Sequence, residues 1–267
     1  MSPEEFAKIL GKIDGQVENV FLHLMGEPLL HPRLSEILDI ADKFDISVKI
    51  TTNGTLLHKA LPILVKSKNL KTVSISLHSF EANEPIGEVS SFHEYLSLCF
   101  ESAKRLAEAD KFAVLRLWNL TDDDTASSSN KDVLEALHHA FPSEWTQTHR
   151  GSRLAYHVFL EWGERFAWPD ITAEEKKETE SLPSDEKKPF CHGLSSQIGI
   201  LCDGRVVPCC LDRNGDINLG NIFESSLSEI LSSERATALI HDLQTRLYRE
   251  PLCKSCEFSK RREHSGA

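Results

Sequence analysis

The fold of this chain is decided by the sequence VENVFLHLMGEP, which covers residues 17–28. Residues 17–24 are rich in β-forming side chains, and residues 25–28 are typical of a turn. Apolar residues at helical spacing follow, at Leu34, Ile37, Leu38, Ala41 and Phe44. A strand that is followed by a turn and an amphipathic helix predicts one βα unit.

The same alternation continues in both directions. Ser2, Pro3 and Glu5 form the signature of a capped helix at the start of the chain. Further strands are expected at residues 48–52, 72–77, 113–120 and 157–162, and further helices at residues 57–65, 92–109 and 132–141. Five strands that alternate with helices predict an α/β fold whose parallel strands form a barrel or an open sheet.

The composition excludes several classes of protein. The 267 residues include 30 Lys and Arg against 41 Asp and Glu, which gives a net charge of −11. Nucleic acid is therefore not an expected partner, because binding to phosphates needs clustered basic residues. No apolar run approaches the roughly 18 residues of a membrane span. The first residues also lack the features of a signal peptide, so we expect a cytoplasmic protein that binds no membrane.

The cysteines are concentrated in the last part of the chain. Cys99 stands alone on an apolar helical face, which indicates core packing. The other six follow much later, at Cys191, Cys202, Cys209, Cys210, Cys253 and Cys256. Seven is an odd number, so the cysteines cannot all form disulfides with one another.

The spacing of four of these cysteines indicates a metal site. Short strands are expected at residues 197–201 and 205–207, joined by a turn at Asp203 and Gly204. Cys191 and Cys209 flank this hairpin, and the pair Cys253 and Cys256 follows a helix expected at residues 227–247. Four thiolates suit zinc and an iron-sulfur cluster equally well. The wide spacing of the first pair favours a cluster over a zinc ribbon, and Cys209 is favoured over Cys210 as the ligand.

A charged stretch divides the chain. Residues 173–188 mix acidic and basic side chains around Pro183, which is typical of a solvated linker. We therefore expect a barrel-like domain at residues 1–167, a linker at residues 168–190 and a metal-binding domain at residues 191–267. The loops at residues 81–91 and 121–130 follow strand ends, where lids are often placed.

These motifs resemble those of radical S-adenosylmethionine (SAM) superfamily proteins that carry a C-terminal SPASM or twitch domain. Residues 25–28 are similar to the family's Gly-Gly-Glu-Pro motif, which binds the amino group of SAM, and residues 51–55 resemble the turn after the next strand. The spacing Cys191-x12-Gly204-x4-Cys209, followed by Cys253-x2-Cys256, is similar to the opening of the SPASM pattern. No cysteine follows Cys256, so one auxiliary cluster is implied.

The resemblance implies a fold, a reaction and a set of site residues. The fold would be a partial parallel (β/α) TIM-like barrel that lacks its first strand, with a small cluster-binding domain. A 5'-deoxyadenosyl radical would oxidise or modify a peptide or small-molecule substrate, with flavodoxin or ferredoxin as electron donor. SAM contacts are implied at Gly26, Glu27, Pro28, Thr52, Asn53, Ser76, His78, Arg116 and Asn119. Ligands of an auxiliary 4Fe-4S cluster are implied at Cys191, Cys209, Cys253 and Cys256.

One family feature is missing from the sequence. The C-x3-C-x2-C triad that binds the SAM-cleaving 4Fe-4S cluster is absent, because no cysteine precedes Cys99. As it stands, the chain is therefore not expected to cleave SAM. We expect that roughly 30 upstream codons, the length of a strand and a loop, encode the missing triad. The alternatives are a non-catalytic iron-sulfur or zinc-binding scaffold and an accessory protein of peptide maturation.

Overall fold

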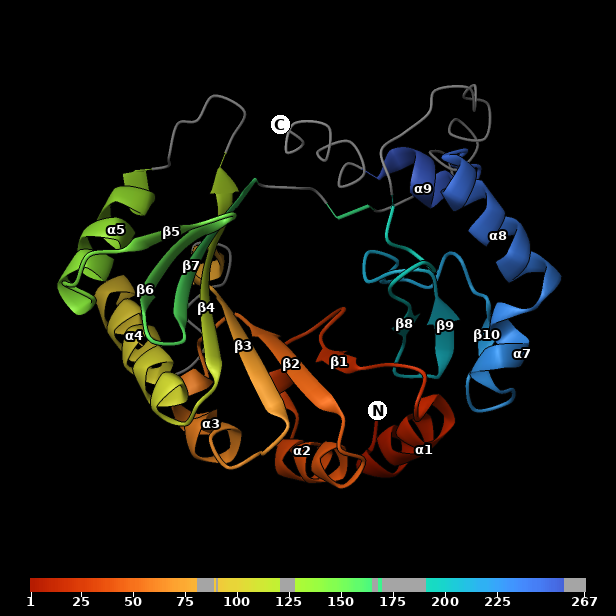
Figure 1. Ribbon diagram of the computed structural model, residues 1–267, viewed down its shortest axis with the longest axis horizontal. Helices are drawn as coiled ribbons and strands as arrows, with labels where there is room; N and C mark the ends of the chain where they lie inside the picture. The colour runs from red at the N-terminus through yellow and green to blue at the C-terminus, as the bar shows by residue number, and fades with distance from the viewer. Residues whose placement is uncertain (81–88, 90, 121–127, 165–167, 170–190, 257–267) are drawn as a thin grey trace. The chain divides into compact units, whose positions relative to one another are not determined.

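A computed structural model describes residues 1–80, 89, 91–120, 128–164, 168–169 and 191–256 (Figure 1). The chain divides into two compact units. The larger contains residues 2–10 and 14–165, and the smaller contains residues 1, 11–13 and 166–267. Most of the expected linker and most of both expected lid loops lie outside the described residues.

The larger unit is built on a seven-stranded sheet in the order β1-β2-β3-β4-β7-β6-β5. Strands β1, β2, β3, β4 and β7 are parallel to their neighbours in this series, while β6 and β5 add an antiparallel hairpin at one edge. The strands are β1 (Asn19–Leu22), β2 (Ser47–Thr52), β3 (Leu70–Ser76), β4 (Phe112–Leu120), β5 (Thr146–Thr148), β6 (Gly151–Ala155) and β7 (Val158–Glu164). The predicted α/β class with parallel strands is confirmed, in the form of a partial barrel.

Helices cover one face of this sheet, as Figure 1 shows for α2 to α5. The helical segments are α1 (Pro3–Ile13), η1 (Pro28–Leu30), α2 (Leu34–Lys43), α3 (Leu57–Leu64), η2 (Leu77–Phe80), α4 (Phe92–Glu108) and α5 (Ser128–Ala140). The predicted capping box at the start of α1 is present, because Ser2 accepts a bond from the Glu5 amide and Glu5 accepts one from the Ser2 amide. The helices predicted between the parallel strands are found at nearly their predicted positions.

The two faces of the sheet differ in polarity. Strand residues alternate between faces, and Ile50, Val73 and Leu115 on the covered face are almost completely buried. The opposite face, here called the inner face, carries Thr51 on β2 and Ser74 on β3, which are cross-strand partners. The helices thus bury the apolar face and leave the inner face polar.

The structure differs from the sequence prediction at two places, one in each unit. The hairpin of β5 and β6 was not expected, since β5 is three exposed residues without an apolar pattern. The single helix expected at residues 227–247 is two helices, α7 (Leu227–Leu231) and α8 (Glu234–Thr245). The break occurs because Ser233 adopts an extended backbone and caps α8 by accepting a bond from the Ala236 amide.

The smaller unit is organised around a three-stranded antiparallel sheet, in the order β10-β9-β8. Its elements are β8 (Gly199–Ile200), β9 (Arg205–Val207), β10 (Gly220–Asn221) and, after α8, the helix α9 (Pro251–Ser255). The predicted hairpin between β8 and β9 is confirmed. Gly204 makes its turn with φ +86°, and a side chain there would overlap Phe223. Strand β10 pairs with β9 through Gly220 and Asn221.

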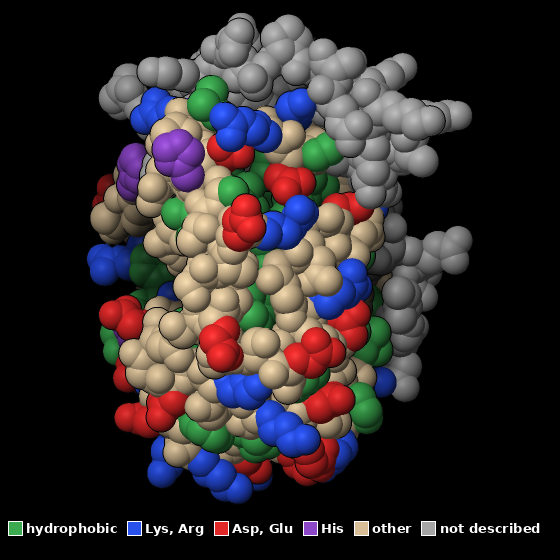
Figure 2. Space-filling model, turned by 90° about the vertical axis from the view of Figure 1, so that its right-hand side faces the viewer, with side chains coloured by type: hydrophobic (Ala, Val, Ile, Leu, Met, Phe, Trp, Pro, Cys, Tyr) green, Lys and Arg blue, Asp and Glu red, His purple; other side chains and the backbone are tan. Residues whose placement is uncertain are grey.

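One face of the smaller unit carries charges of both signs. Figure 2 shows Lys and Arg side chains interspersed with Asp and Glu on the side that bears α7 and α8. Among the described residues, no helix has both the length and the apolar character that crossing a membrane requires.

Gly54 provides a test of the packing between β2 and α4. Its φ is +82°, and a Cβ there would lie 2.8 Å from Cys99 Sγ. Gly15 also has a positive φ, +69°, but a Cβ there would meet no atom within 4 Å. Gly54→Ala should therefore lower the free energy of unfolding by about 1–3 kcal/mol more than Gly15→Ala, measured by urea denaturation. Equal losses would show that α4 relaxes around the extra methyl group.

Candidate cofactor and metal sites

The Glu27 carboxylate joins the loop after β1 to the end of β2. Its Oε1 accepts bonds from Thr52 Oγ1 at 2.7 Å and from the Leu29 amide at 3.0 Å, and its Oε2 accepts a bond from the Asn53 amide at 2.7 Å. A carboxylate has about four acceptor positions. Glu27 is therefore fixed in place with capacity for one further donor.

A side chain of helix α4 supports the turn that follows β2. Asn53 Oδ1 accepts bonds from the Thr55 amide and hydroxyl, at 3.0 and 2.8 Å. The Tyr95 hydroxyl donates to the Asn53 carbonyl at 2.7 Å and to the Ser76 carbonyl at 3.4 Å. Tyr95 thus connects Asn53, which follows β2, with Ser76 at the end of β3, a role that was not predicted from the sequence.

Residues 24–28 form a loop with an unusual backbone. Leu24 has φ 119° and Gly26 has φ 87°, and such values cluster at functional loops. Met25 is exposed, and Pro28 begins η1. The loop therefore presents the predicted motif at the carboxyl end of β1, beside the end of β2.

A row of polar residues crosses the inner face farther along the sheet. Ser76 on β3, Arg116 on β4 and Glu161 on β7 are cross-strand partners. Arg116 Nε lies 3.6 Å from Glu161 Oε2, and both side chains are about three-quarters buried, with 23% and 28% exposure. Burial lowers the pKa of Arg116, while the Glu161 charge acts in the opposite direction. Glu161 was not among the predicted site residues.

The remaining predicted residues of the larger unit have different surroundings. His78 Nδ1 accepts a bond from the Trp118 amide at 3.3 Å and lies 3.3 Å from the Arg116 carbonyl. This nitrogen therefore contacts the backbone of β4. The side chain of Asn119 lies outside the described residues. His23 follows β1, with its Nδ1 3.5 Å from Thr51 Oγ1. Desolvation lowers the pKa of His23, and the Arg116 charge lowers it further.

In the smaller unit, five thiols influence one another electrostatically. Cys209 interacts with Cys191, Cys210 and Cys256, and Cys253 interacts with Cys191, Cys209 and Cys256. Burial raises the pKa of Cys209 to about 12 and raises that of Cys253 well above its usual value, and the neighbouring thiols act in the same direction. Such thiols are uncharged until a metal displaces their protons.

The arrangement has the donor chemistry of an iron-sulfur site. Burial also raises the pKa of the Tyr248 hydroxyl to about 12, with contributions from Cys191 and Cys253, so this ring lies beside the thiols. No group of three or more His, Cys, Asp or Glu side chains has the geometry of a bound metal ion within the described ranges. Thiolates are the ligands that iron-sulfur clusters use. Cys202 is exposed and is not one of the five interacting thiols.

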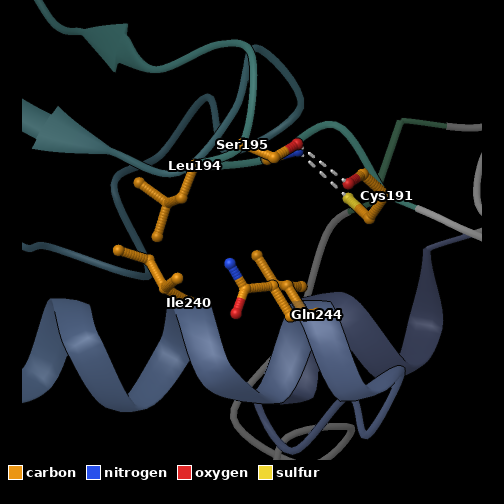
Figure 3. Close-up of a pocket in the computed structure, with 7 residues that line it drawn as sticks. Cys191, Leu194, Ser195, Ile240 and Gln244 are labelled. Atoms are coloured by element: carbon orange, nitrogen blue, oxygen red, sulfur yellow. Dashed lines mark hydrogen bonds between the residues drawn. The ribbon is translucent and has the colours of Figure 1, made fainter.

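Cys191 lies at the edge of a cavity of about 10 Å³, shown in Figure 3. Leu194, Ile240 and Gln244 line this cavity, which has the size of a single water site. The Gly193 amide donates to Cys191 Sγ at 3.4 Å, and Ser195 Oγ donates to the Cys191 carbonyl, also at 3.4 Å. Hydrogen bonds to ligand sulfurs are one means of tuning the potential of a cluster.

Asp212 fixes the loop that follows Cys209 and Cys210. Its side chain is completely buried and accepts bonds from the amides of Asp216 at 2.8 Å and Ile217 at 2.9 Å. This residue was not predicted, because an isolated Asp in a loop carries no distinctive pattern. Its buried bonds hold the backbone beside the two adjacent cysteines.

Two family models match this chain. The model of the radical SAM superfamily matches residues 1–111, and that of the SPASM domain, described as an iron-sulfur cluster-binding domain, matches residues 191–257. The chain belongs to the radical SAM superfamily. It carries a SPASM domain at its C-terminal end. A comparison with curated proteins finds no match.

Solved structures share the fold of this radical SAM protein. BtrN in complex with AdoMet and 2-DOIA aligns with a TM-score of 0.54 at 16% identity, over 96% of this chain and 80% of BtrN. AdoMet-bound anSMEcpe aligns with a TM-score of 0.55 at 13% identity, over 97% and 80%. SuiB of Streptococcus suis bound to S-adenosylmethionine aligns with a TM-score of 0.55 at 16% identity, over 97% of this chain and 64% of SuiB. At these identities the likeness establishes the fold.

Tyr95→Phe tests whether α4 supports the turn after β2. The variant removes the hydroxyl that bonds to the Asn53 carbonyl, and it should lower the free energy of unfolding by about 0.5–1.5 kcal/mol in urea denaturation. Tyr156→Phe is the matched control, since the Tyr156 hydroxyl bonds to exposed Asp110 and its loss should cost less. A larger loss in the control would contradict the role given to Tyr95.

Proposed function

We propose that this chain is part of a radical SAM enzyme that oxidises or modifies a peptide or a small molecule with the help of an auxiliary 4Fe-4S cluster. The proposal is carried by one observation: five widely spaced, half-buried cysteines influence one another electrostatically, which requires their thiols to lie near one another. Buried thiols that lie close together are costly to ionise unless a metal neutralises them. A cluster would remove this cost.

The cluster ligands would be Cys191, Cys209, Cys253 and Cys256. A bound cluster supplies one-electron redox chemistry. Cys210 is a fifth nearby thiol, and burial raises its pKa too. The Gly193 amide would hold the Cys191 sulfur, and Asp212 would hold the loop of Cys209. The protein would thus orient the thiolates through the backbone on both sides of the hairpin.

The SAM contacts would lie at the carboxyl ends of the parallel strands. Glu27 has an unused acceptor position and would bind the amino group, while Gly26 and Pro28 shape its loop. Thr52 and Asn53 would keep the carboxylate in place. The further contacts would be Ser76, His78, Arg116 and Asn119, because ligands of parallel βα folds bind at this end of the strands.

Cleavage of SAM needs an iron site that residues 1–98 do not supply through thiolates. We therefore infer that residues 1–267 alone do not carry out this step. The same observation favours a second function, that of a non-catalytic iron-sulfur or zinc-binding scaffold. Titration with SAM separates the two functions, since a scaffold has no need of the Glu27 site.

Two proteins of similar fold have solved structures with bound molecules that support a proposal for the substrate. SuiB has a solved structure with its precursor peptide SuiA, and BtrN has one with 2-DOIA. We therefore propose a peptide or a small molecule as substrate, with flavodoxin or ferredoxin as electron donor.

Substitution of the four proposed ligands tests the cluster. Anaerobic reconstitution should give about four iron and four sulfide per wild-type chain. Cys191→Ala, Cys209→Ala, Cys253→Ala and Cys256→Ala should each lose most of the iron and destabilise the smaller unit, because metal binding is coupled to folding. Cys202→Ala is the matched control and should retain the iron.

Two outcomes would correct this assignment. A colourless protein with one zinc per chain would contradict the cluster and preserve the ligand set. Loss of iron in Cys210→Ala, with iron retained in Cys209→Ala, would move the ligand to Cys210.

Glu27→Gln tests the SAM site. The substitution keeps the size of the side chain and removes its charge, so it should weaken SAM binding about tenfold, measured by calorimetry. Binding of 5'-methylthioadenosine, which lacks the amino group, should be unchanged. Glu36→Gln, on the surface of α2, should leave both affinities as they are. An equal loss for the two ligands in Glu27→Gln would contradict an amino-group contact.

A further inference from the structure

The carboxyl end of β4 places Trp118 next to two residues that the proposed function assigns to SAM. The central carbon of the Arg116 guanidinium lies 4.7 Å from the centre of the Trp118 ring, which is the geometry of a cation–π contact. The Trp118 amide donates to His78 Nδ1 at 3.3 Å. Trp118 thus contacts both residues, although it is not one of the predicted site residues itself.

An irregularity in the pairing of β4 with β7 marks the position of Trp118. Leu117 pairs with Trp162 and Leu120 pairs with Glu164, so β4 has two residues between these pairs where β7 has one. One extra residue in one strand is a β-bulge, a feature that redirects side chains and is frequent beside active sites. Strand β4 therefore leaves the regular ladder at Trp118 and the residue after it.

Gly163 on β7 provides the space that the Trp118 ring occupies. A Cβ at residue 163 would lie 2.6 Å from Cδ1, 2.7 Å from Cγ and 2.9 Å from Nε1 of Trp118. Gly163 is not among the described glycines with a positive φ, so the backbone conformation does not require a glycine there. The requirement is steric, because any side chain would displace the ring. Gly163 therefore fixes where the Trp118 ring lies.

The orientation of Arg116 matters because its guanidinium is planar and carries its donors in a fixed fork. Its Nε is buried and has no hydrogen-bond partner within the described ranges. This atom lies 3.6 Å from Glu161 Oε2, which is too long for a hydrogen bond. Glu161 therefore attracts the charge without fixing the plane of the group. Stacking on the face of a ring does fix that plane, so Trp118 supplies a contact that sets the direction of the two terminal nitrogens.

We propose that Trp118 is a positioning residue of the SAM site, which orients Arg116 toward SAM and is itself held in place by Gly163. The role rests on the proposed function, since Arg116 is a SAM contact only within it. Trp118 would act through the arginine and not by touching SAM. Loss of the ring should therefore matter only in a chain that still has Arg116, and this dependence separates positioning from general structural support.

Calorimetric titration of the full chain with SAM tests this dependence. Trp118→Leu removes the ring and should weaken SAM binding by about fivefold or more. Trp118→Phe keeps a ring face and should stay within roughly twofold of wild type. In Arg116→Gln, which already binds SAM weakly, the addition of Trp118→Leu should cause no further loss. Trp145→Leu is the matched control, since Trp145 stacks on His138 of α5 and should bind SAM as wild type does.

Two results of this titration would overturn the positioning role. One is wild-type affinity in Trp118→Leu. The other is an equal loss with and without Arg116, which would show that Trp118 supports the site as a whole. Gly163→Ala should reproduce the result of Trp118→Leu, because the added methyl group displaces the ring. Wild-type affinity in Gly163→Ala would overturn the part given to the glycine.

Urea denaturation of the same variants gives a measurement that does not depend on SAM. The losses in the free energy of unfolding of Trp118→Leu and Arg116→Gln should together exceed the loss in the double variant, because both single substitutions remove the same contact. Additive losses would overturn the contact. Wild-type protein that binds no SAM would contradict the proposed function and the positioning role together. SAM binding that depends on Glu27 and not on Trp118 would overturn the positioning role alone.

Discussion

Burial of one complete face of the parallel sheet is the constraint on which the larger unit depends. Because strand residues alternate between faces, side chains such as Ile50, Val73 and Leu115 must all point toward the helices. Every intervening residue is then directed to the inner face. The register between strands aligns Ser76, Arg116 and Glu161 in one row. The polar row is thus a geometric result of the apolar core behind it.

The two units are stabilised by different interactions. In the larger unit, the loops at the strand ends are fixed by a few strong hydrogen bonds to Glu27, Asn53 and Tyr95. In the smaller unit, the strands are two or three residues long, too short to support a sheet without further support. The half-buried thiols and the bonds of Asp212 supply contacts there, and a metal centre would add the largest contribution.

The sequence predicted the elements with strong periodicity, including all five parallel strands and the capping box of α1. It did not predict the β5–β6 hairpin, since three exposed polar residues carry no hydrophobic pattern. The break between α7 and α8 was missed because Ser233 lies inside a run that is otherwise helical. Cysteine spacing and the loop motif can be read directly along the chain. The contacts of Tyr95 and of Trp118 with Gly163 join distant segments, so they depend on tertiary packing that no local pattern records.

The contact between Trp118 and Gly163 also bears on how this sequence can diverge. The indole ring occupies the space that a side chain at residue 163 would need. Replacement of the glycine is tolerated only together with a smaller residue at 118, and a glycine retained beside a small residue would leave a cavity. The two positions, 45 residues apart in sequence by their numbers, should therefore vary as a pair among homologues. A family alignment that keeps the tryptophan should keep the glycine.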